Sequence, residues 1–276
     1  MSDNIWFALG LTVFAGLSTG VGSIMAFFSK KFNPKFLAGS LGFSAGVMIY
    51  VSLVEIFFKA KDSLTGYYGY KEGYWYTVIA FFSGIALIAL IDKLIPSFEN
   101  PHEIKNPDKK KFDAQGNEVI ELPEFKTKLL RMGLFSALAI SIHNFPEGLA
   151  TFIGAMTEPG LGISIAVAVA IHNIPEGIAV SVPIYYATKS RKKALWYSFL
   201  SGVAEPVGAL IGYFILSSFF NEATFGVIFA GVAGIMIYIS LDELLPTAEE
   251  YGEHHVAIGG LISGMAVMAL SLLLMA

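Results

Sequence analysis

Long apolar stretches alternate with short polar ones along the whole chain. A helix that crosses a membrane needs about 20 consecutive, mostly apolar residues, and eight stretches reach this length. The pattern therefore predicts eight transmembrane helices, at residues 5–28, 36–58, 75–95, 129–156, 160–186, 193–219, 224–244 and 256–275. The connections are short, except for the polar residues 96–128, which we expect to form a loop. We expect one transmembrane domain that covers residues 1–276.

The composition supports an all-α integral membrane fold. Hydrophobic residues make up 55% of the chain and charged residues only 14%, whereas about 25% of the residues of an average soluble domain are charged. A net charge of −4 and the lack of a long basic tract argue against a nucleic acid partner. The chain has no cysteine, which excludes disulfide bonds and thiolate metal sites.

The distribution of lysine and arginine predicts the orientation in the membrane. The connections that follow the odd-numbered helices hold 15 of the 18 basic residues, and the opposite side holds only Lys59, Lys61 and Lys71. Cytoplasmic loops carry an excess of Lys and Arg. We therefore expect a multi-pass protein of the cell (cytoplasmic) membrane, with both termini outside and the loop 96–128 in the cytoplasm.

Two of the predicted helices carry nearly the same sequence. Residues 45–55 read AGVMIYVSLVE and residues 233–243 read AGIMIYISLDE, with eight of eleven positions identical. They lie on the second and seventh helices and so cross the membrane in opposite directions. Such inverted repeats are typical of transporters, whose binding site lies near the midplane between the repeats. A weaker similarity between residues 16–22 and 202–208, on the first and sixth helices, is compatible with chance.

A polar motif occurs twice inside apolar sequence, as HNFPEG at residues 143–148 and as HNIPEG at residues 172–177. In each copy the histidine and the glutamate are four residues apart, so that both lie on one helical face, which the asparagine borders. The proline removes a helical donor, a defect that is tolerated at membrane depth where the backbone faces protein or a cavity. Face to face, the fourth and fifth helices would gather six polar side chains: His143, Asn144, Glu147, His172, Asn173 and Glu176.

These side chains form a ligand set for a divalent transition metal. Imidazole, amide and carboxylate groups together suit Zn, Fe, Mn, Co or Ni, whereas Ca and Mg prefer sites made mostly of oxygen. Glu205 on the sixth helix adds a third carboxylate. In a single copy, the histidine could equally be a hydrogen-bonded core residue and the glutamate a protonated one. The duplication on two antiparallel helices favours the metal site.

Other polar residues allow two interpretations. Glu55, Asp242 and Glu243 lie near helix ends and are either part of a metal path or solvated carboxylates. Met48 and Met236 occupy matching repeat positions and are either thioether ligands or packing residues. The stretch EEYGEHH at residues 249–255 is either a metal-releasing site or a polar turn.

With these motifs, the chain resembles the ZIP (Zrt/Irt-like) metal transporters, and within them the bacterial ZupT-like branch. The resemblance covers essentially the whole chain. It implies a 3+2+3 helix bundle with a binuclear metal site, whose ligands would be His143, Asn144, Glu147, His172, Asn173, Glu176 and Glu205. It also implies a metal-accepting residue on the second helix, for which Met48 is the match. The loop 96–128 lacks the cluster of histidines found in many relatives.

The resemblance and the residues together predict uptake of divalent transition metals, zinc with iron, manganese or cobalt, into the cytoplasm by alternating access. The first, fourth, fifth and sixth helices would hold the metal, and the others would rock against them. We expect no enzymatic activity and no cofactor besides the transported metal. Membrane lipid and a second copy of the chain in a homodimer are the expected partners. A metal-selective channel or sensor is the main alternative, and an intramembrane metal-dependent hydrolase is less well supported.

Overall fold

The computed structural model describes residues 2–26, 34–94, 122–216, 221–251 and 254–275, and within these ranges the side chain of His143 is not among those described. In this part of the chain the structure is helical except at the junctions at residues 69, 158, 189–190 and 221. The elements are α1 (Ser2–Ala26), α2 (Pro34–Val51), η1 (Ser52–Ile56), α3 (Phe57–Tyr68), α4 (Tyr70–Leu94), α5 (Leu122–Thr157), α6 (Pro159–Thr188), α7 (Arg191–Leu216), α8 (Glu222–Ile239), η4 (Ser240–Leu244), α9 (Leu245–Tyr251) and α10 (His254–Met275).

These elements form eight helical rods in the described residues, because α2, η1 and α3 follow one another without interruption, as do α8, η4 and α9. Seven of the described rods are long and apolar enough to cross a membrane, and α5, which packs along α6, is the eighth. The predicted all-α fold of an integral membrane protein is thus confirmed. Three rods precede the central α5–α6 hairpin in the chain, and three follow it.

The helices differ from the predicted ones mainly in length. The second rod continues to Tyr68 rather than ending near residue 58, and the seventh continues to Tyr251 rather than to residue 244. The apolar pattern missed α3 because this helix is polar on one side, while its Ala60 and Leu64 are buried. It ends at Gly69, whose φ of 87° suits a residue without a side chain.

The loop expected at residues 96–128 is shorter at its second end. Helix α5 begins at Leu122, so the last seven residues of the expected loop are helical. A polar helix start carries no apolar signal, which is why the sequence pattern assigned it to the loop. Residues 95–121 lie outside the described residues, and so does the predicted end of the first helix at residues 27–28.

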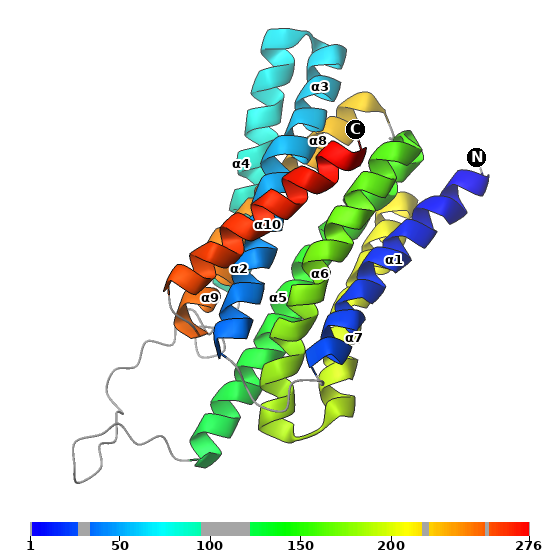
Figure 1. The fold of residues 1–276 in the computed structure, drawn as a ribbon. Helices are drawn as coiled ribbons and strands as arrows, with labels where there is room; N and C mark the ends of the chain where they lie inside the picture. Colours follow the sequence, from blue (N-terminus) through cyan, green and yellow to red (C-terminus); the bar gives the residue numbers. More distant parts are fainter. Residues whose placement is uncertain (1, 27–33, 95–121, 217–220, 252–253, 276) are drawn as a thin grey trace.

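The rods fall into two groups (Figure 1). We call α1, α5, α6 and α7, which pack closely on one another, the four-helix body. We call the remaining elements the flanking body, in which α2 packs on α10 and α8 packs on α3 and α4. The two bodies meet mainly where α2 lies along α6 and where α5 approaches α8.

The similar sequences at residues 45–55 and 233–243 also share an unusual backbone. Each rod leaves the α-helical form for one turn of π-helix, at Ser52–Ile56 in η1 and at Ser240–Leu244 in η4. The two π-helical turns are 188 residues apart in the chain, and the two similar sequences have the same spacing. The turns therefore occur at equivalent positions of the repeat. π-Helical turns inside α-helices often accompany functional sites. The repeat is therefore structural as well as sequential.

Candidate metal site

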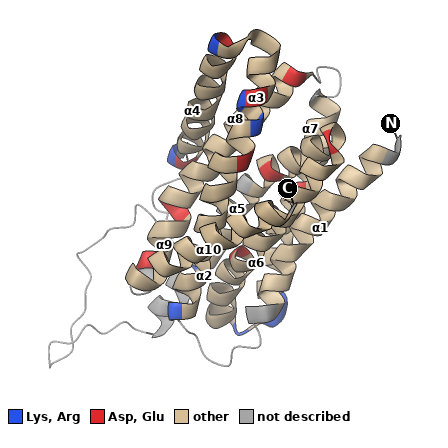
Figure 2. Cartoon of the chain, turned by 45° about the horizontal axis from the view of Figure 1, so that its top comes forward, with Lys and Arg blue, Asp and Glu red and all other residues tan. Residues whose placement is uncertain are grey.

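Six of the seven predicted ligands have described side chains, and all six are at most 1% exposed: Asn144, Glu147, His172, Asn173, Glu176 and Glu205. They come from α5, α6 and α7 of the four-helix body. His143 lies on α5 as predicted, with its side chain outside those that the structure describes. Figure 2 shows acidic positions in the interior of the bundle, while the basic ones lie toward helix ends.

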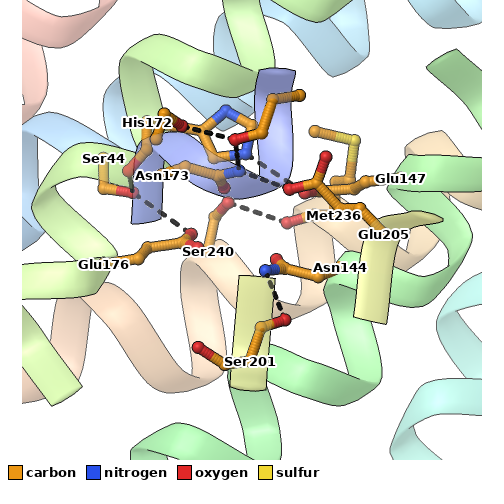
Figure 3. Close-up of polar contacts among 12 residues, drawn as sticks. Ser44, Asn144, Glu147, His172, Asn173, Glu176, Ser201, Glu205, Met236 and Ser240 are labelled. Carbon is orange, nitrogen blue, oxygen red and sulfur yellow. Dashed lines mark hydrogen bonds and ion pairs between the residues drawn. The ribbon is translucent and has the colours of Figure 1, made fainter. Parts of the chain in front are cut away.

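The two copies of the motif contact each other directly. His172 Nε2 on α6 lies 3.2 Å from Glu147 Oε2 on α5, and Figure 3 shows the two side chains pointing toward each other. The imidazole and the carboxylate are both buried, so the contact lies in a region of low dielectric constant, where such an interaction is strong. The prediction that the fourth and fifth helices present their motifs to each other agrees with this contact.

The two asparagines are oriented by hydrogen bonds from their amide nitrogens. Asn173 Nδ2 donates to Glu205 Oε1 on α7 and to the carbonyl oxygen of Ala15 on α1, the latter at 2.9 Å. Asn144 Nδ2 donates to the carbonyl oxygen of Ser201 on α7 at 3.1 Å. The hydrogen bonds donated by the amide nitrogens fix the orientation of each amide. The amide oxygens are then the atoms that can bind a cation.

Four buried oxygens of the site have no hydrogen-bond partner among the described residues: Asn144 Oδ1, Glu147 Oε1, Asn173 Oδ1 and Glu205 Oε2. Buried polar atoms nearly always have a partner, and an exception is often the site of a water or an ion. In the described side chains, which leave out that of His143, no three His, Asp or Glu groups converge on one point where an ion could be held. Four of the predicted ligands instead bond to one another in two pairs, His172 with Glu147 and Asn173 with Glu205.

Glycines allow the ligand-bearing helices to approach closely. A Cβ atom at Gly148 would collide with the carbonyl oxygen of Glu205, and one at Gly177 would collide with that of Thr19. These two glycines are the last residues of the two motifs and hold α5 against α7 and α6 against α1. Small residues at helix contacts are typical of membrane proteins. Both α5 and α6 continue as helices through the motif prolines Pro146 and Pro175.

Two small pockets flank the site and correspond to each other through the repeats. We call them the Ile56 pocket and the Leu244 pocket, after residues that are equivalent in the two repeats. The walls contributed by α5 and α6 also match, since residues 29 positions apart line the two pockets: Ile165 and Ser136, Val169 and Ile140, Ala150 and Ala179. Glu147 lines the Ile56 pocket. The pockets are thus arranged symmetrically about the ligands.

The methionines and helix-end carboxylates that allowed two interpretations are distributed unevenly around these pockets. Met48 and Met236 are both buried, and Met236 lines the Ile56 pocket beside Glu147. Glu243 lines the Leu244 pocket, whereas Glu55 is half-buried and is absent from the described walls of both pockets. Asp242 is half-buried on η4.

The polar stretch at residues 249–255 contains one described ion pair. His254 Nδ1 lies 2.7 Å from Glu249 Oε1, and both residues are exposed. Residues 252 and 253 lie outside the described part.

Sequence reasoning missed three groups that contact the predicted ligands. The backbone carbonyls of Ala15 and Ser201 accept from the two asparagines, and no residue type could have signalled them. Ser44 on α2 lies next to Glu176 and is fully buried. Its signal in the sequence was a polar residue on an apolar helix, one position before the repeated stretch.

Comparison with known proteins gives the family of the chain. The family described as ZIP Zinc transporter matches residues 96–272. The chain belongs to this family. Proteins called zinc transporter ZupT from Chlorobaculum parvum and Chlorobium chlorochromatii are each 67% identical to it over 274 residues, which cover 99% of the chain and 99% of each relative. The ZupT of Streptococcus mutans is 61% identical, again over 99% of both chains. The predicted resemblance to ZupT-like ZIP transporters is confirmed.

Proposed function

We propose that this ZIP protein carries divalent transition metals, zinc among them, into the cytoplasm by alternating access through a binuclear site. The ligands would be His143, Asn144, Glu147, His172, Asn173, Glu176 and Glu205. Support comes from the relatives, which are called zinc transporters at 55–67% identity over nearly the full chain. It also comes from the composition of the site, because imidazole, amide and carboxylate groups together suit zinc and its neighbours.

The observation that carries the proposal is the group of four buried oxygens without a partner in the described structure. Two belong to carboxylates, and an isolated charge inside a membrane costs about 2.5–3.5 kcal/mol on insertion scales. A dication that contacts these oxygens would offset that cost and satisfy the amide oxygens as well. No alternative partner for them exists among the described side chains.

The contacts between helices support movement of one body against the other. Within the four-helix body, glycines bring backbones together, for example Gly16 against Gly202 and Gly208 against Phe145. Within the flanking body, Gly46 contacts the backbone of Leu261 and Gly84 that of Gly231 in the same way. Among the described glycines, none places the backbone of one body against the backbone of the other.

The contact between the bodies consists mainly of larger apolar side chains. One buried cluster runs across it and includes Leu41, Val51, Ile165 and Phe229. At the described glycines, movement along this surface separates no close backbone-to-backbone contact, so each body can move as a unit. The predicted division, in which the metal-binding helices move relative to the others, agrees with the four-helix and flanking bodies, since α1, α5, α6 and α7 are the first, fourth, fifth and sixth rods.

A carrier is expected to show saturable zinc flux. In proteoliposomes, the initial rate of radioactive zinc uptake should reach a plateau as the zinc concentration rises. It should also increase steeply with temperature, because each ion requires a conformational cycle. Unlabelled Fe, Mn, Co, Ni and Cd should compete to different extents. Flux that rises linearly with concentration would instead favour the metal-selective channel. A hydrolase is not supported, because a catalytic zinc has three protein ligands and an open position for water, whereas these ligands are duplicated.

The direction of transport follows from the charge distribution. Both described ends of the chain, Ser2 and Met275, lie at one end of the bundle in Figure 1, and the helix ends that flank the long loop lie at the other. The sequence assigns 15 of the 18 basic residues to the connections that follow the odd-numbered helices, among them the long loop. We therefore place the termini outside and the loop in the cytoplasm, in the cell membrane. The transported metal is the substrate in this proposal, with no separate cofactor, and lipid and a second copy remain the proposed partners.

Cysteine labelling tests this orientation. Because the chain has no native cysteine, Ser2→Cys should react in intact cells with a thiol reagent that does not cross the membrane. Ala114→Cys, in the long loop, should react only after the cells are permeabilised. The reverse pattern would contradict both the orientation and the direction of transport.

A further inference from the structure

A serine of the flanking body touches a ligand of the four-helix body. Ser44 on α2 is fully buried, and its Oγ lies 3.4 Å from Glu176 Oε1 and 3.3 Å from the carbonyl oxygen of His172. Figure 3 shows Ser44 facing Glu176 across this contact. A hydroxyl has one proton, so it shares a long hydrogen bond between the two acceptors. This bond crosses the contact between the bodies at the level of the metal ligands.

The repeats do not supply the same contact twice. The position equivalent to Ser44, 188 residues later, is Val232, and the ligand equivalent to Glu176 on α5 is Glu147. Val232 is 3% exposed and has no hydroxyl to donate. The eleven positions that follow are alike in the two repeats, with eight identical residues that begin at Ala45 and Ala233. One half of the transporter therefore has a donor toward its glutamate, and the other half does not.

The contact between the two bodies is also more extensive in the half that contains Ser44 than in the half that contains Val232. Helix α2 lies along α6 more extensively than α8 lies along α5. Transporters built from inverted repeats alternate access by movement of one body against the other around the site. We take the opposite conformation to be the one in which the two halves exchange their packing. In that conformation α8 would lie along α5, and Val232 would approach Glu147 without a hydrogen bond.

We infer that Ser44 is a positioning residue that stabilises the present conformation by donating to Glu176, and that Val232 leaves the opposite conformation without an equivalent bond. This inference rests on the proposed alternating access. The difference between two otherwise matched residues would bias the resting carrier toward one side. Hydrogen bonds between membrane helices are modest in strength, so the bias from this contact is about threefold in population.

Two repeat-equivalent positions can report the conformation. Ser136 lines the Leu244 pocket and Ile165 the Ile56 pocket. Ser136→Cys and Ile165→Cys are introduced separately into the cysteine-free chain. In detergent, where both ends are accessible, the labelling rates with a water-soluble maleimide give a ratio that follows the balance between the two conformations. Ser44→Ala should change this ratio by about threefold.

The valine position provides an independent variant. Val232→Thr keeps the side-chain shape and adds a hydroxyl that can donate to Glu147 in the opposite conformation. It should therefore shift the labelling ratio in the same direction as Ser44→Ala. The double variant should shift the ratio by about tenfold, because the two effects multiply. Ser44→Thr, which keeps the hydroxyl, should remain near the original ratio. Thermal stability measured alongside should change little, because none of these variants opens a large cavity.

Zinc separates failure of this inference from failure of the proposed function. If zinc changes the labelling ratio but Ser44→Ala and Val232→Thr do not, or if they shift it in opposite directions, the role of Ser44 is overturned and alternating access stands. If neither zinc nor either variant changes the labelling ratio, the role of Ser44 and the proposed alternating access are both overturned.

Discussion

Replacement of Glu147 or Glu176 by alanine is expected to abolish zinc uptake, with a loss of at least about 100-fold. Substitution of groups that only orient metal ligands already lowers metal affinity or activity by about 10–100-fold. These carboxylates are ligands themselves in the proposed site. Glu147 presents one oxygen to His172 and leaves the other without a partner in the described structure, so it can serve two neighbouring ions. Initial rates of radioactive zinc uptake, in proteoliposomes with equal amounts of folded protein, measure the effect.

The matched control is Glu222→Ala, because Glu222 is an exposed carboxylate at the start of α8. It should retain normal uptake. Asn144→Ala removes only a hard oxygen ligand and should change the order in which competing metals inhibit more than it lowers zinc uptake. Normal zinc uptake by Glu147→Ala would rule out the proposed ligand set, even with the fold intact.

Substitution of the motif glycines is expected to destabilise the protein itself. In Gly148→Ala or Gly177→Ala the new methyl group meets a backbone carbonyl, that of Glu205 or of Thr19. Backbone atoms cannot rotate away, so the helices must separate, at a cost of about 1–3 kcal/mol. Thermal unfolding of the purified transporter in detergent should show a lowered midpoint for each variant.

Gly20→Ala on α1 is the control for this experiment. A Cβ atom there meets nothing within 4 Å, and alanine favours a helix over glycine by about 1 kcal/mol. Its unfolding midpoint should therefore stay the same or rise. If Gly148→Ala behaved like Gly20→Ala, the close approach of α5 and α7 would not be essential, and the rigidity of the four-helix body would be in doubt.

The membrane fold followed from the sequence, and so did the candidate site residues, because both depend on local patterns. The thickness of a bilayer sets the length of an apolar helix, so eight apolar stretches were enough to predict eight rods. The 3.6-residue turn places His172 and Glu176 on one face wherever the helix lies. The residue types are those that suit transition metals in the proposed site. The polar extension α3 escaped the prediction because its helical form depends on burying Ala60 and Leu64.

The partners of the ligands were decided by the tertiary structure alone. Glu147 bonds to His172, 25 residues away, and Asn173 reaches Glu205 and the backbone of Ala15, 158 residues away. Ser44 meets Glu176 across 132 positions. Such pairings depend on which helices lie side by side and how closely, and contacts at glycines fix both. A local sequence pattern determines which residues share a face, and only the packed bundle determines what that face meets.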